Sequence, residues 1–324
     1  MKYLRMFLTF LKNNKKKVFL GFLAYVVFLF LLFPFSDLGS YVTTQIAKLT
    51  QNQVFLKFKE LHFSLLPSPG LELTDVKAQG IQFPPLSADS VMVSPSIAGL
   101  LSFKPGVSLS AKGIFDGDLD LTTRGGSKAT SGALKQNITI DAEGIELSKL
   151  SQLLALPMTL EGKMNLDSDA VIDPSFSEQP DAQVDLKATR INITAASVPT
   201  PIGPLALPDT KLQELILKGQ MNKGELNIEK AQIGSPSDEL YAQVRGTMSL
   251  NFQSSGGQVN VNPGAFDLTI QIKTKPSYQA KAGLFLGFLD SYKKSETPQG
   301  REYIFKVSGA NFYGPPRMTP ANSF

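Results

Sequence analysis

The sequence predicts a mainly β protein in which a single N-terminal transmembrane helix precedes a long antiparallel β-sheet with a few short helices. Three observations predict this fold. Residues Val18–Phe35 form an uncharged apolar run, the hydrophobic period changes from 3.6 to 2 at Val54, and many of the chain's 26 Gly and 21 Pro residues separate the short runs that follow. Period-two alternation is typical of strands with one buried face, and Gly and Pro are typical of the turns between strands.

The apolar run Val18–Phe35 is long enough to cross a bilayer. Its 18 residues would span roughly 27 Å as a helix. The alternative, a cleaved signal peptide, would have a shorter apolar region and a small-residue cleavage site, which the next residues do not offer. Lys12 and Lys15–Lys17 precede the run, so the positive-inside rule places the N-terminus in the cytoplasm and the chain from Ser36 onward outside it. Residues 1–17 are therefore expected to be a cytoplasmic basic tail.

The segment Glu60–Gly80 predicts a β-hairpin just beyond the membrane. Apolar and polar residues alternate in Leu61–Leu65 and again in Leu71–Thr74, on either side of the turn sequence Pro67–Gly70. A short amphipathic helix is expected before the hairpin, within residues 36–51, where the apolar residues recur at helical spacing.

Strand-like runs dominate the remainder of the chain. After the hairpin they are Val107–Ala111, Leu119–Thr123, Asn137–Asp141, Gly162–Asp167, Gln183–Thr194, Leu212–Lys218, Glu225–Ile233, Leu240–Phe252, Phe266–Lys273 and Tyr303–Ser308. Two short helices are expected to interrupt them, at Leu147–Leu156 and at Ser277–Lys294, the second docked on the sheet.

The proline-rich segment 197–210 is expected to divide the β domain. Its four prolines exclude a central strand. We interpret it as a linker or strap between a first half, residues 36–196, and a second half, residues 211–313. Residues 314–324 are expected to form a disordered tail.

No catalytic, cofactor-binding or metal-binding residues are predicted. The chain has no cysteine, and its one histidine, His62, alternates with apolar neighbours and is expected on the outer face of a strand. Asp116, Asp118 and Asp120 lie at alternate positions, but the segment lacks the later Gly and the bidentate Glu of a calcium loop. They are expected on a solvated strand face, and the protein is expected to be non-enzymatic and to need no cofactor.

The net charge of +4 does not indicate a nucleic-acid partner. Six of the 32 Lys and Arg residues lie in residues 1–17, and the remaining 26 are outnumbered by 28 acidic residues. A slightly acidic body without a basic stripe argues against nucleic-acid binding.

The order of these features resembles a known family. Segments such as "FKELHFSLLPSPGLELTDVKAQGIQF", "LEGKMNLDSD" and "YIFKVSGANFYGPPRMTP", following a basic tail and an anchor, resemble type II secretion system protein N in its deltaproteobacterial form. The hairpin also resembles the start of AsmA-like proteins. The resemblance implies a long, curved antiparallel sheet with an apolar concave face, in the periplasm of a Gram-negative cell and anchored in the inner membrane by a single pass.

The resemblance implies two alternative functions. In the first, the protein is a structural or assembly subunit in type II protein secretion, and it contacts other secretion components or the outer-membrane secretin through sheet edges. In the second, it is an AsmA-like lipid-binding or lipid-transfer protein that carries phospholipid in an apolar groove between the inner and outer membranes. A closed core with free sheet edges would favour the first, and an apolar stripe open to solvent would favour the second.

Overall fold

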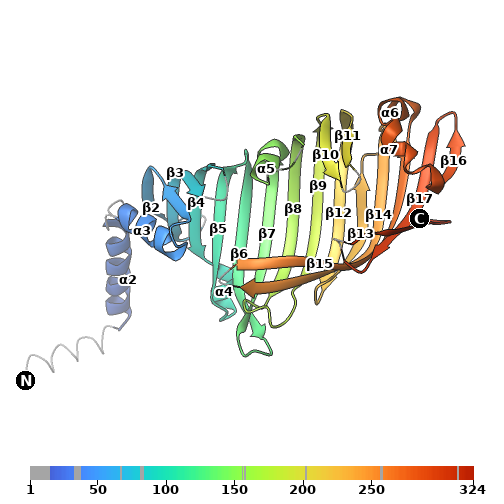
Figure 1. The fold of residues 1–324 in the computed structure, drawn as a ribbon. Coiled ribbons are helices and arrows are strands. Elements are labelled where there is room, and N and C mark those ends of the chain that lie inside the picture. The colour runs from blue at the N-terminus through green and yellow to red at the C-terminus, as the bar shows by residue number, and fades with distance from the viewer. Residues whose placement is uncertain are drawn as a thin grey trace, which may run out of the picture.

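The computed structural model describes residues 15–32, 38–65, 68–80, 84–154, 156, 158–200, 203–255, 258–311 and 314–324. One antiparallel sheet of 16 strands forms the body of the protein (Figure 1). From β3 to β9 and from β12 to β15, each strand pairs with the next strand in the chain. The predicted mainly β fold with one large antiparallel sheet and a few short helices is confirmed.

The strands of this sheet have the following bounds. They are β1 (Val54–Lys57), β2 (Glu60–Ser64), β3 (Gly70–Gly80), β4 (Leu86–Pro95), β5 (Gly106–Ile114), β6 (Gly117–Lys128), β7 (Leu134–Glu146), β8 (Leu160–Ile172), β9 (Asp181–Ile193), β12 (Thr210–Asn222), β13 (Glu225–Ile233), β14 (Leu240–Ser255), β15 (Gln258–Thr274), β16 (Lys293–Thr297), β17 (Gly300–Gly309) and β18 (Arg317–Pro320).

The N-terminal region contains two helices and the predicted hairpin. Helix α2 (Lys15–Leu32) precedes α3 (Gly39–Leu49), which confirms the expected amphipathic helix. The hairpin is formed by β2 and β3, paired from Glu60↔Thr74 to Ser64↔Gly70. The predicted membrane span 18–35 ends at residues that lie outside the described ones. In the described part of the chain, no helix is both long enough and apolar enough to cross a membrane.

The proline-rich segment folds as a separate hairpin. Strands β10 (Ala196–Thr200) and β11 (Gly203–Leu207) pair only with each other in the described structure, and β9 pairs directly with β12 beginning at Ile193↔Thr210. The segment is therefore an excursion between two adjacent strands of one continuous sheet.

Three elements differ from the expectations. Strand β4 was not predicted. The expected helix at Ser277–Lys294 is divided into α6 (Pro276–Lys281), α7 (Gly283–Gly287) and the 3₁₀ turn η2 (Asp290–Tyr292), and its last residues belong to β16. Glycine is a poor helix former, which fits the break before Gly283. The tail expected to be disordered contains β18, which pairs with β17 because that strand offers a free edge there.

Gly246 allows β14 and β15 to approach closely. Its φ is +139°, and a Cβ atom built there would lie 2.0 Å from the carbonyl oxygen of Asp267. Gly246→Ala should therefore lower the free energy of unfolding by about 2 kcal/mol or more. Gly125→Ala is the matched strand control, because its Cβ would meet only the Pro105 carbonyl oxygen, at 3.7 Å. Urea unfolding of both variants checks this, and equal stabilities would contradict it.

Candidate binding site: an apolar trough along the sheet

One face of the sheet carries an unbroken apolar row. The row crosses thirteen strands through directly paired positions, from β2 to β17. Its members are Leu61, Leu73, Val91, Ala111, Leu119, Ala142, Leu166, Leu186, Leu217, Ala231, Val244, Ile270 and Phe305. Alternate residues of a strand share a face, so each strand adds its period-two pattern to one surface.

A second row runs parallel to the first, two residues along each strand except β13, where a register shift makes the step three residues. It consists of Phe63, Leu71, Val93, Leu109, Leu121, Ile140, Ser168, Val184, Gly219, Ile228, Gly246, Leu268 and Val307. Ser168 is its one polar side chain, and the two glycines leave the surface lower where they lie. The two rows together form an apolar band along the sheet.

The opposite face is polar at the corresponding positions. The row that lies between the two apolar ones on the other side includes Asp120, Asp141, Asp167, Asp185 and Lys218, directly paired in that order. Like charges facing one another across strands are mildly destabilising, which is tolerable only where water screens them. The charge pattern therefore identifies this face as the solvated one.

The apolar face is continuous rather than divided into separate cores. Three clusters of buried residues lie along it, and each shares partly buried neighbours with the next. Ile114 contacts both the N-terminal and the central cluster, and Ile233 and Leu240 contact both the central and the C-terminal cluster.

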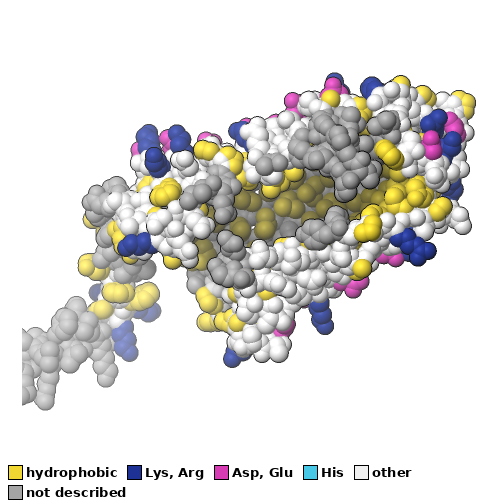
Figure 2. Space-filling model, viewed as in Figure 1, with side chains coloured by type: hydrophobic (Ala, Val, Ile, Leu, Met, Phe, Trp, Pro, Cys, Tyr) yellow, Lys and Arg dark blue, Asp and Glu magenta, His cyan; other side chains and the backbone are white. Residues whose placement is uncertain are grey.

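The middle of this face is hollow and open. Figure 2 shows a depression lined by hydrophobic side chains that runs along the molecule. Leu109, Leu121, Ile140 and Leu186 are only half-buried there. We call this surface, the apolar face of β4–β9, β12 and β13, the trough. With neighbouring strands about 4.8 Å apart, its eight strands extend over roughly 34 Å.

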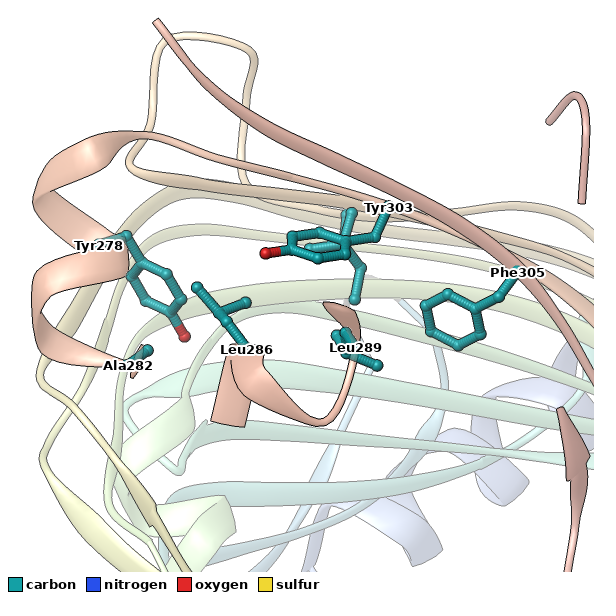
Figure 3. Packing of buried hydrophobic residues seen from close by; sticks show 8 residues of the cluster. Tyr278, Ala282, Leu286, Leu289, Tyr303 and Phe305 are labelled. Carbon is teal, nitrogen blue, oxygen red and sulfur yellow. The ribbon is translucent and has the colours of Figure 1, made fainter. Parts of the chain in front are cut away.

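Short helices close the C-terminal end of the face. Tyr278, Ala282, Leu286 and Leu289 pack onto residues of β14, β15 and β17 (Figure 3). Leu286 is 1% exposed, and the ring of Tyr292 lies 5.5 Å from that of Phe305. The trough therefore ends at α6, α7 and η2.

Leu286→Ala should destabilise this closed end. Removing the side chain leaves a cavity between α7 and the sheet, so the free energy of unfolding should fall by about 2–5 kcal/mol. Phe288→Ala is the control, because Phe288 is 58% exposed and its loss should cost less than about 0.5 kcal/mol. Denaturant unfolding measures both, and a Leu286 effect as small as that of Phe288 would contradict the packing.

The two long rims of the sheet carry different structures. In Figure 1, α5 (Leu147–Leu153), the β10–β11 hairpin and α6 lie along the upper rim, and α4 (Ile97–Leu101) lies on the lower one. The distal part of the β14–β15 hairpin extends back across the strands, beyond a register shift between Met248 and Leu250. We call the described residues of this part, 249–255 and 258–263, the arm.

The arm is attached to the loop between β8 and β9. The ring of Phe252 stacks on that of Phe176, with centroids 6.1 Å apart. The backbone N–H of Phe252 donates to Oε1 of Gln179 at 2.8 Å, and Nε2 of Gln179 donates to the Phe252 carbonyl at 3.1 Å. One side chain thus satisfies both backbone groups of an arm residue.

Two carboxylates hold this loop in shape. Asp173, 2% exposed, accepts hydrogen bonds from the hydroxyl and backbone N–H groups of Ser177 and Ser175, which keep its pKa well below the ordinary value. Glu178 accepts hydrogen bonds from Lys135 and from both donors of Thr130, which lower its pKa to about 2. The loop is thereby tied to the neighbouring β6–β7 connection.

Acid should loosen this part of the rim. Because the pKa of Glu178 is about 2 in the folded protein and about 4.3 in an unfolded chain, its contribution to stability is present above pH ~4 and is lost as the pH falls toward 2. Glu178→Gln should therefore lose less melting temperature between pH 5 and pH 2.5 than the wild type. Glu229→Gln, an exposed site on β13, is the control and should behave as the wild type; equal losses in all three proteins would contradict the assignment.

The residues singled out in the sequence do not meet at a site. His62 is exposed on β2, with Nε2 3.2 Å from Oε2 of Glu72. Asp118 and Asp120 lie exposed on β6 as expected, whereas Asp116 lies in the β5–β6 turn and pairs with Lys149 at 2.7 Å. Among the described residues, no group of three or more His, Asp and Glu residues could hold a metal ion.

Sequence reasoning identified the strands that line most of the trough but not its rims. The alternation in each run indicates which residues share a face. For the rim, the segment "DPSFSEQP" contains Asp and Ser residues, whose side chains favour turns by hydrogen-bonding to nearby backbone groups. The attachment of that loop to Phe252, 73 residues away from Gln179, has no local signal.

Comparisons with known proteins identify no relative. No family model, no curated protein and no solved structure matches this chain.

Proposed function

We propose that the protein binds the acyl chains of lipids in the trough. The single observation that carries the proposal is the continuous apolar face that stays half-exposed in its middle, over β4–β13. Exposed apolar surface of this extent is rare on soluble monomers and marks an interaction site. A ligand that covered it would gain roughly 25 cal/mol for each Å² of apolar surface removed from water.

The shape of the trough favours the acyl chains of lipids as ligands over a compact molecule. It is long and lined on its floor by aliphatic side chains with a single serine among the paired positions. Its length of roughly 34 Å matches the ~30 Å hydrocarbon core of a bilayer, which is two chains end to end. A two-chain phospholipid would therefore leave part of the trough unfilled, and more than one lipid could lie along it.

A membrane location supports the same ligand. Large apolar side chains point outward around α2, among them Phe19, Phe22, Tyr25 and Phe28, and Lys15–Lys17 precede them. We propose that this apolar region anchors the protein in a membrane, with the sheet on the side away from Lys15–Lys17. The membrane would be the inner membrane and the compartment the periplasm, as the family resemblance implies. Lipid is then available beside the N-terminal end of the sheet.

A role as a type II secretion subunit stays a prediction. It would use a free sheet edge for pairing with another component. The edge strand β16 is only five residues long and carries Lys293, Lys294 and Glu296, which are features that discourage edge pairing. No observation on the described residues favours this role over lipid binding.

Polar substitutions on the trough floor should abolish lipid binding. The double variant Leu121→Asn/Ile140→Asn changes two directly paired residues of the apolar face. The amount of lipid photo-crosslinked to the sheet should fall at least tenfold, because the acyl chains would then contact asparagine amides that lack hydrogen-bond partners. Crosslinking uses the full chain in detergent micelles and a phospholipid with a diazirine on its acyl chain.

The matched control is Thr122→Asn/Thr139→Asn, the next pair on the opposite face of the same two strands. It should crosslink as the wild type does. The proposal fails if both double variants crosslink equally, or if the wild-type sheet takes up no label.

A further inference from the structure

The connection between β4 and β5 holds two apolar side chains out in solvent. We call residues 97–104, which comprise α4 and the turn after it, the α4 loop. Leu101 is 79% exposed and Phe103 is 95% exposed. Phe103 has a φ of +54°, a conformation that an aromatic residue adopts only where the surrounding structure enforces it.

Hydrogen bonds hold the α4 loop in a defined conformation. At its base the N–H of Ser96 donates to the Gly106 carbonyl at 3.0 Å, and within it the N–H of Lys104 donates to the Gly99 carbonyl at 2.8 Å. The Ser96 hydroxyl accepts from the N–H of Gly99 at 3.2 Å. A Cβ atom at Gly99 would lie 2.5 Å from the Lys104 carbonyl oxygen. The exposure of the two side chains is therefore fixed by the backbone.

The loop joins the trough. Pro95 and Val107, at its two ends, are paired, and Val107 is exposed. Val107 lies two residues before Leu109, on the same face, and Leu109 belongs to the second apolar row. The tip of the β2–β3 hairpin lies beside this point, with the Ser68 hydroxyl 3.1 Å from that of Ser94. An apolar path thus leads from the α4 loop onto the trough floor.

The charge and size of this surface suit a lipid bilayer. No Asp or Glu occurs between Val91 and Ile114, whereas Lys104 and Lys112 do, which favours a surface with anionic lipids. Two projecting side chains, one on the five-residue helix α4 and one in the turn after it, offer far less than the ~800 Å² that each partner contributes to a stable protein interface. They are sufficient for shallow insertion at the level of the lipid headgroups.

The position of the loop agrees with the proposed anchor. In Figure 1, α2 extends downward at the N-terminal end of the sheet, and α4 lies on the lower rim. A bilayer reached by α2 would lie on the side of the molecule from which the α4 loop projects.

We propose that the α4 loop inserts into the bilayer surface and so places the end of the trough near Val107 next to the membrane lipids. Leu101 and Phe103 enter the boundary between headgroups and acyl chains, Lys104 contacts headgroup phosphates, and a chain passes along Val107 to the trough floor. This role as an entry site rests on the proposed function, whereas the insertion itself can be measured without it.

The absence of cysteine from the chain makes the test specific. The full chain with Phe103→Cys or Leu101→Cys carries one environment-sensitive fluorophore and is reconstituted in vesicles of phosphatidylcholine with a minor share of phosphatidylglycerol. Nitroxide-bearing lipids should quench both labels several-fold more than a label at Lys187→Cys, an exposed site on the polar face of β9. Labels at 101 and 103 that iodide in the water quenches as strongly as the label at 187 would overturn the insertion.

A second measurement separates the entry site from the trough. Leu101→Ser/Phe103→Ser should lower the rate of lipid uptake from vesicles several-fold, and leave crosslinking of lipid supplied in micelles unchanged. Unchanged uptake from vesicles would overturn the entry role. Failure of the trough itself has a different signature, namely inserted labels at 101 and 103 together with a wild-type sheet that takes up no lipid from either source.

Discussion

The structure depends on one constraint, which is that an apolar sheet face has to be covered. Direct pairing keeps apolar residues in register across thirteen strands, so the uncovered area grows with each strand added. Among the described residues, covering elements lie at the two ends of the face and along its rims, where Leu147 and Leu150 of α5 pack on the central cluster. Leu38 and Val42, from the region of α3, pack at the N-terminal end, and α6 and α7 pack at the C-terminal end. Between the two ends the face stays open, and this open surface makes the protein a candidate for binding the acyl chains of lipids.

Much of the sheet could be predicted because its signal is local. The hairpin Glu60–Gly80 and most of the later strands alternate with period two, and the same alternation names the residues on the apolar face. Strand β4 was missed because Leu86–Pro95 mixes Ser, Asp and Ala among its apolar residues, which blurs the alternation. The depth and openness of the apolar face depend on the curvature of the sheet, which the alternation of residues does not indicate. Only the family resemblance implied that this face is concave.

The remaining features depend on contacts between distant residues. Strand β18 forms because β17 has a free edge, and the arm is held because Gln179 and Phe176 meet Phe252. Neither contact has a sequence pattern of its own. The helix expected at 277–294 is broken before Gly283, and Leu286 and Leu289, which follow the break, pack on the sheet. This packing has no counterpart in the apolar periodicity of the segment. The apolar floor thus follows from local residue patterns, whereas the rim depends on contacts between residues far apart in the sequence.

The central claim is that the trough holds lipid chains, and lipid extraction followed by mass spectrometry tests it most directly. The full chain, purified in a nonionic detergent and washed exhaustively, is compared with a peptide of residues 1–38, which carries the apolar segment without the sheet. The account predicts at least one two-chain lipid for each full chain beyond what the peptide retains. Equal lipid on both would contradict it, and would mean that the apolar face is covered in some other way.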